Sequence, residues 1–597
     1  MKGKHTFKGG AEYRRTRNGS SFFNDRQGTV SPWSVEDLVT DMMFSDDADL
    51  YFNGGPYNGS MALASASINP NTGTLPDYYR GYRANEVGMY FQDDWRIHPR
   101  LTLNLGVRRE YFGPPHNFKP NSDSNFYFGS TVVPFTTTSN NPFFPSGNPY
   151  YARVATGSFQ VRNHSIWNKD LNNFGPRVGF SWDALGNQKL VVRGGFGVMY
   201  DRIYNNIFEN IRFNPPFFSD VTFGAVANGV AAGGLFTPGF YQIPFVANTN
   251  GSLISPAIFP DGLPLANPRH MDQDLVSPYY EQTHFGVQYQ LAKNFVLESN
   301  YIGTLGRKLM GIINLNTFDG RRAPGFDRTR PNPNIGSDNF RTNAFSSNYN
   351  ALQMSIRKTY SFGLQFNANY TYSKALDQLS DAFRPKIGNY GATAYQPSDA
   401  SNIGLDYGPA DFDVRHRFVM SYNYDLPFMK QSRWLGGWQL NGIFSWQSGT
   451  PVAIWDPTND INRDGVTSDR PMYAPGFNGT NVTTSNNPAN GYFKPNAYMS
   501  VTCPNDVNMG LWCNSPMRRN DVYGPKFVNL DFGLGKSFRV TEGSKLTFMA
   551  NFFNIFNHPN MDMPEGNFGS PNFGYSLNTL GDNGGHRITQ LALRFDF

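Results

Sequence analysis

The stretch LTLNLGVRREY, at residues 101–111, alternates between apolar and polar side chains over most of its length. The apolar positions are Leu101, Leu103, Leu105, Val107 and Tyr111, and the polar ones are Thr102, Asn104, Gly106, Arg108 and Glu110. Because successive side chains of a β-strand point to opposite faces, this pattern predicts a strand with one apolar and one polar face. The apolar face suits hydrocarbon, whereas Arg and Glu on the other face require water.

The same alternation recurs along the whole chain, in segments bounded by turn-forming residues. It predicts about fourteen strands, at residues 2–17, 84–96, 100–112, 176–184, 189–201, 281–291, 294–304, 347–360, 362–374, 413–425, 436–449, 526–539, 544–557 and 586–597. We therefore expect an all-β chain.

The predicted connections alternate between short and long. Tight turns at 97–100, 185–188, 292–293 and 541–543 alternate with connections of about 28 to about 79 residues, of which 202–280 is the longest. Soluble domains rarely contain loops beyond about 15 residues, whereas outer-membrane barrels combine short periplasmic turns with long extracellular loops. In lipid such strands must close into a barrel, because every backbone group has to be paired. The alternative is a half-buried antiparallel sheet of a soluble protein.

Composition favours the membrane reading. Charged residues make up 16% of the 597 residues, against a usual value of about 25%. Aromatic residues also reach 16%, with 52 Phe and 32 Tyr. The sequence contains no run of about 18 apolar residues and its mean hydropathy is −0.48, which excludes a transmembrane helix. A barrel escapes this test, because only alternate residues face lipid.

Neither charge nor motifs point to nucleic-acid binding or catalysis. The net charge of +5 is spread without a basic block, so we expect no nucleic-acid partner. The nine His residues form no metal-binding pair, and the chain has no nucleophile elbow and no phosphate-binding loop; it is therefore not expected to be an enzyme. Arg415, His416 and Arg417 open a predicted strand and could face the lumen or the rim, and we interpret them as lumen polarity.

The chain ends in Leu593-Arg594-Phe595-Asp596-Phe597. A terminal Phe with apolar residues two and four positions earlier resembles the signal by which the barrel-assembly machinery recognises new outer-membrane proteins. Leu593, Phe595 and Phe597 are therefore the candidate assembly signal.

Several segments resemble the C-terminal barrel of TonB-dependent receptors, in particular the Oar-like subfamily. They are EVGMYFQDDW (86–95), LTLNLGVR (101–108), NALQ (350–353), YTYSK (370–374), DFDVRHRF (411–418), GWQLNG (437–442) and FFNIFNH (552–558). The resemblance implies a barrel that usually has 22 strands, with a plug and a carboxypeptidase-regulatory-like domain ahead of it. Because neither a plug nor a TonB box nor a signal peptide is recognisable, we expect residues 1–597 to be a single, N-terminally truncated barrel domain with about fourteen of these strands.

The resemblance also implies a function in the bacterial outer membrane. We expect uptake of a large ligand such as an oligosaccharide, a peptide or a metal chelate, captured by the long loops at 18–83, 113–175, 202–280 and 450–525. The implied partners are outer-membrane lipid and lipopolysaccharide, the barrel-assembly machinery, an unidentified extracellular ligand and, in the full-length protein, the TonB complex. Two alternatives stay open: a passive 14-stranded channel, and a surface adhesion protein anchored by a barrel.

One loop pattern is typical of calcium binding. Residues 460–465, DINRDG, place oxygen ligands at positions 1, 3 and 5 and Gly at position 6, as a Ca²⁺ loop requires. The candidate ligands are Asp460, Asn462, Asp464, the carbonyl of Val466, and Asp469. Position 12, where a bidentate Glu is expected, is Pro471, and an Asx-rich turn that caps its own backbone is the alternative. No cofactor is required.

The two cysteines of the chain, Cys503 and Cys513, lie close together in one irregular stretch. In an oxidising compartment such a pair favours a loop disulfide, and two unpaired thiols are the alternative.

Overall fold

The computed structural model describes residues 3–21, 29–31, 63–69, 76–129, 154, 156–161, 165–224, 265–317, 330–383, 397–400, 402–427, 432, 435–457, 461, 469–484, 491–501, 515–541, 543–580 and 585–597. Within these ranges, none of the helices has the length and apolar character needed to cross a membrane.

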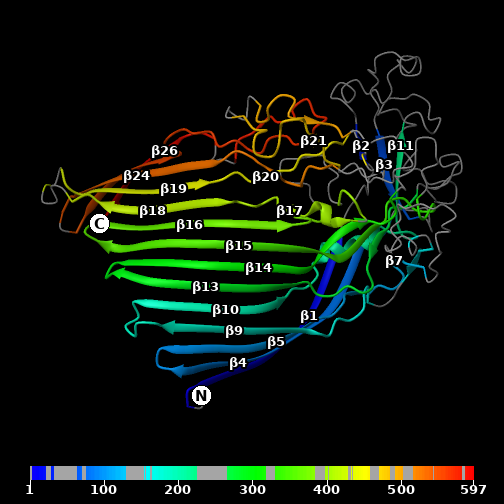
Figure 1. The fold of residues 1–597 in the computed structure, drawn as a ribbon, viewed down its shortest axis with the longest axis horizontal. Coiled ribbons are helices and arrows are strands. Elements are labelled where there is room, and N and C mark those ends of the chain that lie inside the picture. Colours follow the sequence, from blue (N-terminus) through cyan, green and yellow to red (C-terminus); the bar gives the residue numbers. More distant parts are fainter. Residues whose placement is uncertain are drawn as a thin grey trace.

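Fourteen long strands follow one another in a curved antiparallel sheet, and each corresponds to one predicted strand (Figure 1). They are β1 (His5–Ser21), β4 (Tyr79–His98), β5 (Leu101–Phe112), β9 (Asn173–Asp183), β10 (Leu190–Tyr200), β13 (Tyr279–Ala292), β14 (Phe295–Asn314), β15 (Asn339–Ser361), β16 (Leu364–Asp377), β18 (His416–Asp425), β19 (Trp438–Gln447), β24 (Phe527–Arg539), β25 (Lys545–Phe553) and β26 (Ile588–Asp596). Short turns lie at one end of the strands and long connections at the other, as expected (Figure 1).

The outer strands of this sheet are β1 and β26. Among the described residues β1 has a register only with β4, and β26 only with β25. The two strands lie on opposite sides of the curved sheet in Figure 1. The fourteen strands therefore form a curved wall with two edges.

The register places polar and apolar residues in separate rows across the strands. One row runs from Lys8 through Gln92, Gly106 and Arg177 to Gly197. A row of the opposite parity contains, in order, Phe285, Tyr301, Leu352, Tyr372 and His416. Directly paired residues point to the same side of a sheet. The sheet thus has one polar and one apolar face, which confirms the alternation predicted from the sequence.

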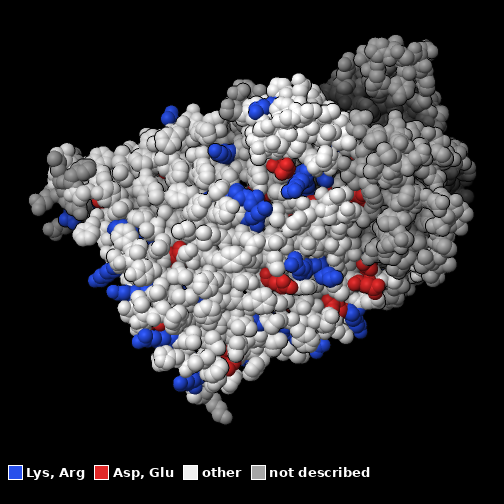
Figure 2. All heavy atoms as spheres, in the orientation of Figure 1, with Lys and Arg blue, Asp and Glu red and all other residues white. Residues whose placement is uncertain are grey.

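Large side chains of the apolar face are exposed rather than packed. Phe91, Phe285 and Leu352 keep 54%, 48% and 41% of their surface accessible. Exposed apolar area of this extent is unfavourable in water but suits contact with lipid. Figure 2 shows a face with a wide uncharged area and with Lys and Arg along the short-turn edge.

The long connections contain structure that the sequence analysis did not predict. Short strands β6 (His116–Asn117), β12 (Arg269–Met271) and β17 (Gly408–Pro409) extend the main sheet. Separate small sheets are formed by β2 (Thr29–Ser31), β3 (Leu63–Ile68) and β11 (Ser219–Gly224); β7 (Ser124–Tyr127) and β8 (Ser158–Val161); β20 (Pro451–Val452) and β23 (Val522–Tyr523); and β21 (Met472–Tyr473) and β22 (Tyr498–Met499). The helical elements are α4 (Asn205–Glu209), η1 (Asn210–Phe213) and η2 (Ile403–Asp406).

The hydrophobic core lies among these connections rather than against the sheet. Ile207 and Met271 are completely buried in one cluster, and Val482 is completely buried in another. A third cluster surrounds Phe126 and Leu315. We call this region, formed by the described parts of the long connections, the loop layer. Its packed clusters hold chain segments that are far apart in the sequence.

Candidate functional site

The polar face carries a ladder of charged residues toward the loop layer, on β1, β4 and β5. Arg108 Nε donates to Glu110 Oε1 at 2.8 Å, and Arg14 Nη1 lies 3.6 Å from Glu86 Oε2. Arg202 reaches the other oxygen of Glu86 at 3.4 Å. These side chains are partly exposed, so each pair contributes at most about 1 kcal/mol to stability. Together they place alternating positive and negative charges along the polar face.

Farther from the loop layer, the same face contains a hollow of about 590 Å³ above β5, β9, β10 and β13. Its lining includes four glycines of the polar parity: Gly106, Gly179, Gly195 and Gly197. Side chains are missing at these positions, which deepens the surface between the larger residues around them.

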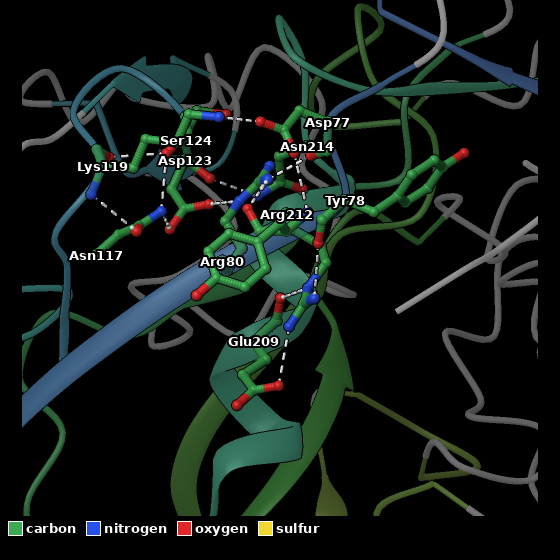
Figure 3. A network of polar contacts seen from close by, with 12 residues as sticks. Asp77, Tyr78, Arg80, Asn117, Lys119, Asp123, Ser124, Glu209, Arg212 and Asn214 are labelled. Carbon is green, nitrogen blue, oxygen red and sulfur yellow. Dashed lines mark hydrogen bonds and ion pairs between the residues drawn. The ribbon is translucent and has the colours of Figure 1, made fainter. Parts of the chain in front are cut away.

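A buried charge network fixes the loop layer to the upper ends of β1 and β4 (Figure 3). The Arg80 side chain is 2% exposed and pairs with Asp123, which also accepts a hydrogen bond of 2.9 Å from the Tyr82 hydroxyl. Asn117 Nδ2 donates to the same carboxylate at 3.1 Å. Removing one partner of a buried ion pair costs about 3–5 kcal/mol, so this contact holds the 113–127 connection firmly against β4.

A second arginine in Figure 3 joins helix η1 to β1 and to the start of β4. Arg212 donates to Glu209 Oε2 at 2.9 Å, to Ser20 Oγ at 2.7 Å and to the Tyr78 carbonyl at 3.1 Å. Burial lowers the pKa of Arg212, and the nearby Tyr82 and Glu209 offset part of that change. The segment 201–214, which lies within the longest predicted loop, is therefore anchored and not free.

The DFDVRHRF segment forms a third anchor, between β16, β18 and the 450–525 connection. Asp413 is 1% exposed and accepts hydrogen bonds from the Ala375 amide at 2.6 Å and the Tyr523 hydroxyl at 2.7 Å. Arg415 Nη2 lies 3.0 Å from the same carboxylate. Burial, together with the bond to Asp413, raises the pKa of Tyr523 to about 12.

Arg519 reinforces this anchor. Its guanidinium contacts Asp377 at 2.6 Å and Asp411 at 3.0 Å, and Asn520 Nδ2 also donates to Asp411 at 2.6 Å. Burial lowers the pKa of Arg519, but Asp411 and Asp377 outweigh it, and the pKa lies above its usual value. A charged hydrogen-bond network thus holds the 515–525 segment onto the sheet.

The structure separates the three basic residues Arg415, His416 and Arg417: Arg415 precedes β18 and pairs with Asp413, whereas the other two lie on the strand. Arg417 has the polar parity, in register with Thr371, as expected for a residue of the lumen. His416 has the opposite parity: its Nδ1 is 2.8 Å from the Tyr370 hydroxyl, and its ring lies 5.1 Å from that of Tyr372. The expectation of lumen polarity is therefore wrong for His416, which lies in an aromatic belt at the rim of the apolar face.

A buried His–Asp pair lies in the loop layer. His270 Nδ1 is 3.0 Å from Asp338 Oδ2, and both side chains are at most 1% exposed. The rings of Phe126, Phe128 and Phe340 surround the imidazole at 4.5–5.2 Å. Such an enclosed pair positions β12 beside β15 rather than presenting a reactive group to solvent.

The candidate calcium loop lies almost wholly outside the described residues. Asp460, Asn462, Asp464 and Val466 belong to undescribed segments. Asp469 is described: it is 2% exposed, and its Oδ2 accepts a hydrogen bond of 2.7 Å from the Ile461 amide. Over the described ranges, no group of three His, Cys, Asp or Glu residues is arranged to hold a metal ion. Calcium binding stays a prediction.

Some of the other predicted site residues are described by the structure and some are not. Cys503 and Cys513 lie outside the described residues, so the disulfide stays a prediction. Leu593 and Phe595 lie on β26 with the apolar parity, and Phe597 follows the strand; the three are 68%, 52% and 98% exposed. Their role as an assembly signal stays a prediction.

Sequence reasoning missed the two arginine anchors at Arg80 and Arg212 and the hollow above β10. Neither arginine belongs to a recognisable motif. Asp123 is 43 residues from Arg80 and Ser20 is 192 residues from Arg212, and the pair of Arg212 with Glu209, three residues earlier, has no distinctive sequence pattern. The glycine-rich sequence at 194–197 is the one local signal that could have indicated the hollow. The registers of β10 with β9 and β13 run through these glycines without a shift.

Comparisons with known proteins agree with a curved wall of strands in the outer membrane. A family model described as “Outer membrane beta barrel domain” matches residues 1–590. Among curated protein sequences, none is significantly similar to the chain.

Several solved structures are similar to the chain. The outer membrane transporter YddB from Escherichia coli has a TM-score of 0.38 and 10% identity, over 91% of this chain and 56% of its own. The FrpB iron transporter from Neisseria meningitidis has a TM-score of 0.38 and 9% identity, over 99% and 52%. The pyoverdine receptor FpvA from Pseudomonas aeruginosa has a TM-score of 0.38 and 10% identity, over 90% and 49%. The chain thus spans about half the length of these proteins. Because TM-scores below 0.5 do not establish a shared fold, the fold rests on the strand registers and the family match.

Proposed function

Because the chain belongs to the outer membrane beta barrel domain family, we propose that it forms part of the wall of a TonB-dependent, Oar-like receptor in the bacterial outer membrane. This receptor takes up a ligand too large for passive diffusion, such as an oligosaccharide, a peptide or a metal chelate. The observation that carries the proposal is the polar face, which continues in register across all fourteen strands beneath a packed loop layer.

The polar face supports transport better than simple anchoring. An anchor needs only the apolar face, whereas this wall also presents a ladder of Arg and Glu and a hollow of about 590 Å³ toward the enclosed side. The loop layer supports a receptor because its buried anchors give a preformed surface. Preformed surfaces lose less entropy when they bind a ligand.

The two edge strands, β1 and β26, support a barrel wall that continues with further strands. Edge strands of this length expose unpaired backbone groups, which lipid does not satisfy. We infer that about eight further strands pair with β1 and β26 to complete a 22-stranded barrel, and that a plug fills its lumen. Reading the coding DNA in frame ahead of the Met1 codon tests this directly. A signal peptide, a plug and further strands are expected; an in-frame stop codon close to Met1 contradicts it.

An uptake assay tests the function itself. In the native bacterium, cells with and without the gene are given three labelled probes: maltoheptaose, a decapeptide and a ferric chelate. We expect energised accumulation of one probe, lost on gene deletion and abolished by a protonophore. Uptake that survives the protonophore identifies a passive channel, and accumulation of all three probes that ignores the gene refutes transport.

Three further properties belong to the proposal. Leu593, Phe595 and Phe597 act as the assembly signal, Asp460 to Asp469 bind Ca²⁺ at the millimolar concentrations found outside cells, and Cys503 and Cys513 form a disulfide. Each is supported by its sequence pattern and by a position at the chain terminus or in a long connection. The expected partners are outer-membrane lipid and lipopolysaccharide, the assembly machinery and the TonB complex.

A further inference from the structure

The hollow of the polar face differs from the rest of that face in its charge. Its lining includes Arg108, Arg177 and His284, and it contains no Asp or Glu. Arg108 is paired with Glu110, but Arg177 has no carboxylate partner among the described residues. In the ladder closer to the loop layer, by contrast, Arg14 and Arg202 share Glu86.

Two of the basic side chains, His284 and Arg177, lie against glycines of β10. A Cβ atom at Gly195 would lie 2.6 Å from Cε1 of His284, so the imidazole extends over that glycine from β13. A Cβ at Gly197 would lie 3.4 Å from Cγ of Arg177, whose stem passes beside it from β9. Arg177 and His284 therefore lie on the two sides of β10, opposite glycines that are two residues apart along the strand.

Amide groups complete the lining. Gln282 lies in the same cross-strand row as Arg177, and Asn104 lies in the row of His284. Gln92 shares the row of Arg177, but its Nε2 already donates to Asp94 Oδ1 at 2.7 Å. Amides donate hydrogen bonds from fixed positions, and a guanidinium binds carboxylate or phosphate oxygens in pairs. This combination recognises an oxyanion, and the neighbouring carboxylates of Asp94 and Glu110 are paired with Lys8 and Arg108.

We propose that the hollow is a binding site for an anionic group, a carboxylate or a phosphate, on a solute inside the lumen. Arg177 binds the oxyanion, with Arg108 and His284 on either side. The proposal rests on the proposed function in one respect, that the polar face lines a lumen. It also gives a role to the glycines: they provide clearance for a ligand and its two flanking side chains.

Binding is measured on the protein expressed from its complete gene and purified from outer membranes in detergent. The probes are citrate for the carboxylate and inorganic phosphate for the tetrahedral anion, titrated calorimetrically at low salt. We expect Arg177→Gln to raise the Kd of the preferred probe about tenfold, because a hydrogen bond to a charged group is lost. Gly197→Leu, which fills the hollow without changing charge, is expected to weaken binding to a similar extent.

Arg357→Gln is the matched control. Arg357 lies on β15 with the polar parity, in register with Val296 and Asn367, and is not part of the hollow. The Kd of the Arg357→Gln variant for the preferred probe is expected to stay within twofold of that of the unsubstituted protein. An equal loss of affinity in Arg357→Gln and Arg177→Gln overturns the proposal, because the anion is then attracted by the positive charge of the whole polar face and not by the hollow. Absence of binding by both probes also overturns it.

The uptake assay separates this inference from the proposed function. If Arg177→Gln weakens anion binding but cells show no energised uptake, the site stands and the receptor function fails. If uptake occurs and Arg177→Gln changes neither binding nor uptake, the receptor function stands and the anion site fails. Each variant must first show the β-sheet circular dichroism spectrum of the unsubstituted protein.

Discussion

Asp413→Ala is predicted to release the 515–525 segment from the sheet without unfolding the wall. The carboxylate receives the Ala375 amide at 2.6 Å and the Tyr523 hydroxyl at 2.7 Å, and it pairs with Arg415 at 3.0 Å. All three contacts are lost in the variant, while the strand registers on either side of the site stay intact.

The magnitude follows from burial. Asp413 is 1% exposed, and breaking a buried ion pair by removing one partner costs about 3–5 kcal/mol. Arg415 keeps 22% of its side-chain surface exposed and recovers part of this cost from water, so the lower end of that range is expected. At about 1.4 kcal/mol per factor of ten, the population of the open segment rises by about 100-fold.

Limited proteolysis of the purified protein measures that population. When opening is fast relative to cleavage, the cleavage rate follows the equilibrium between closed and open segments. The control is Phe412→Ala in the same motif, since Phe412 is 65% exposed and its loss should change the rate less than twofold. Equal cleavage rates for Asp413→Ala and Phe412→Ala would refute the role given to the carboxylate.

Four further predictions concern the loops and the terminus. Burial raises the pKa of Tyr492 and Tyr523 to about 12, so these phenols stay protonated to higher pH in the folded protein than in the unfolded one. The loops should therefore stay docked below pH 10 and dock less stably between pH 10 and 12, which faster proteolysis would show. Arg212→Met should raise the rate at which protease cleaves residues 201–214 at least tenfold, because Glu209 loses its buried partner. An unchanged cleavage rate would contradict the anchoring role of Arg212. Ca²⁺ should protect the 458–468 region from protease in the unsubstituted protein but not in Asp464→Ala, and identical protection in both argues for a simple turn. Deleting Phe597 should lower the amount of protein in outer-membrane fractions severalfold, whereas normal amounts would exclude it from the assembly signal.

The fourteen strands were predictable because their signal is local. Alternation with a period of two depends only on which face meets lipid, and each strand carries it independently of its neighbours. The main error was in length: the strand predicted at 294–304 extends to Asn314, and the one predicted at 347–360 begins at Asn339. The additional residues of these two strands lie in the loop layer, where Ile312, Ile313 and Phe340 pack into hydrophobic clusters. Packing partners, not the lipid, determine where these strands end.

The loop layer was not predictable for a related reason. Its order depends on contacts between residues far apart, such as Asn125 with the backbone of Met271 and Asn332 with the carbonyl of Val154. No local pattern marks such pairs, because Asn is also the common residue of free loops. The site shows the same limit: parity distinguishes Arg417 from His416 only once a register is known, because a shift of one residue exchanges the two faces.

The location of the core affects how the proposed receptor would bind its ligand. A sheet whose apolar face meets lipid and whose polar face meets water buries little between its own faces, so the packed clusters lie in the loop layer. Segments held by Arg80, Arg212 and Asp413 resist displacement, each at a cost of several kcal/mol. A ligand that had to move all three would lose that energy from its affinity. We therefore expect capture on the loop layer in its existing conformation, with conformational change confined to segments outside these anchors.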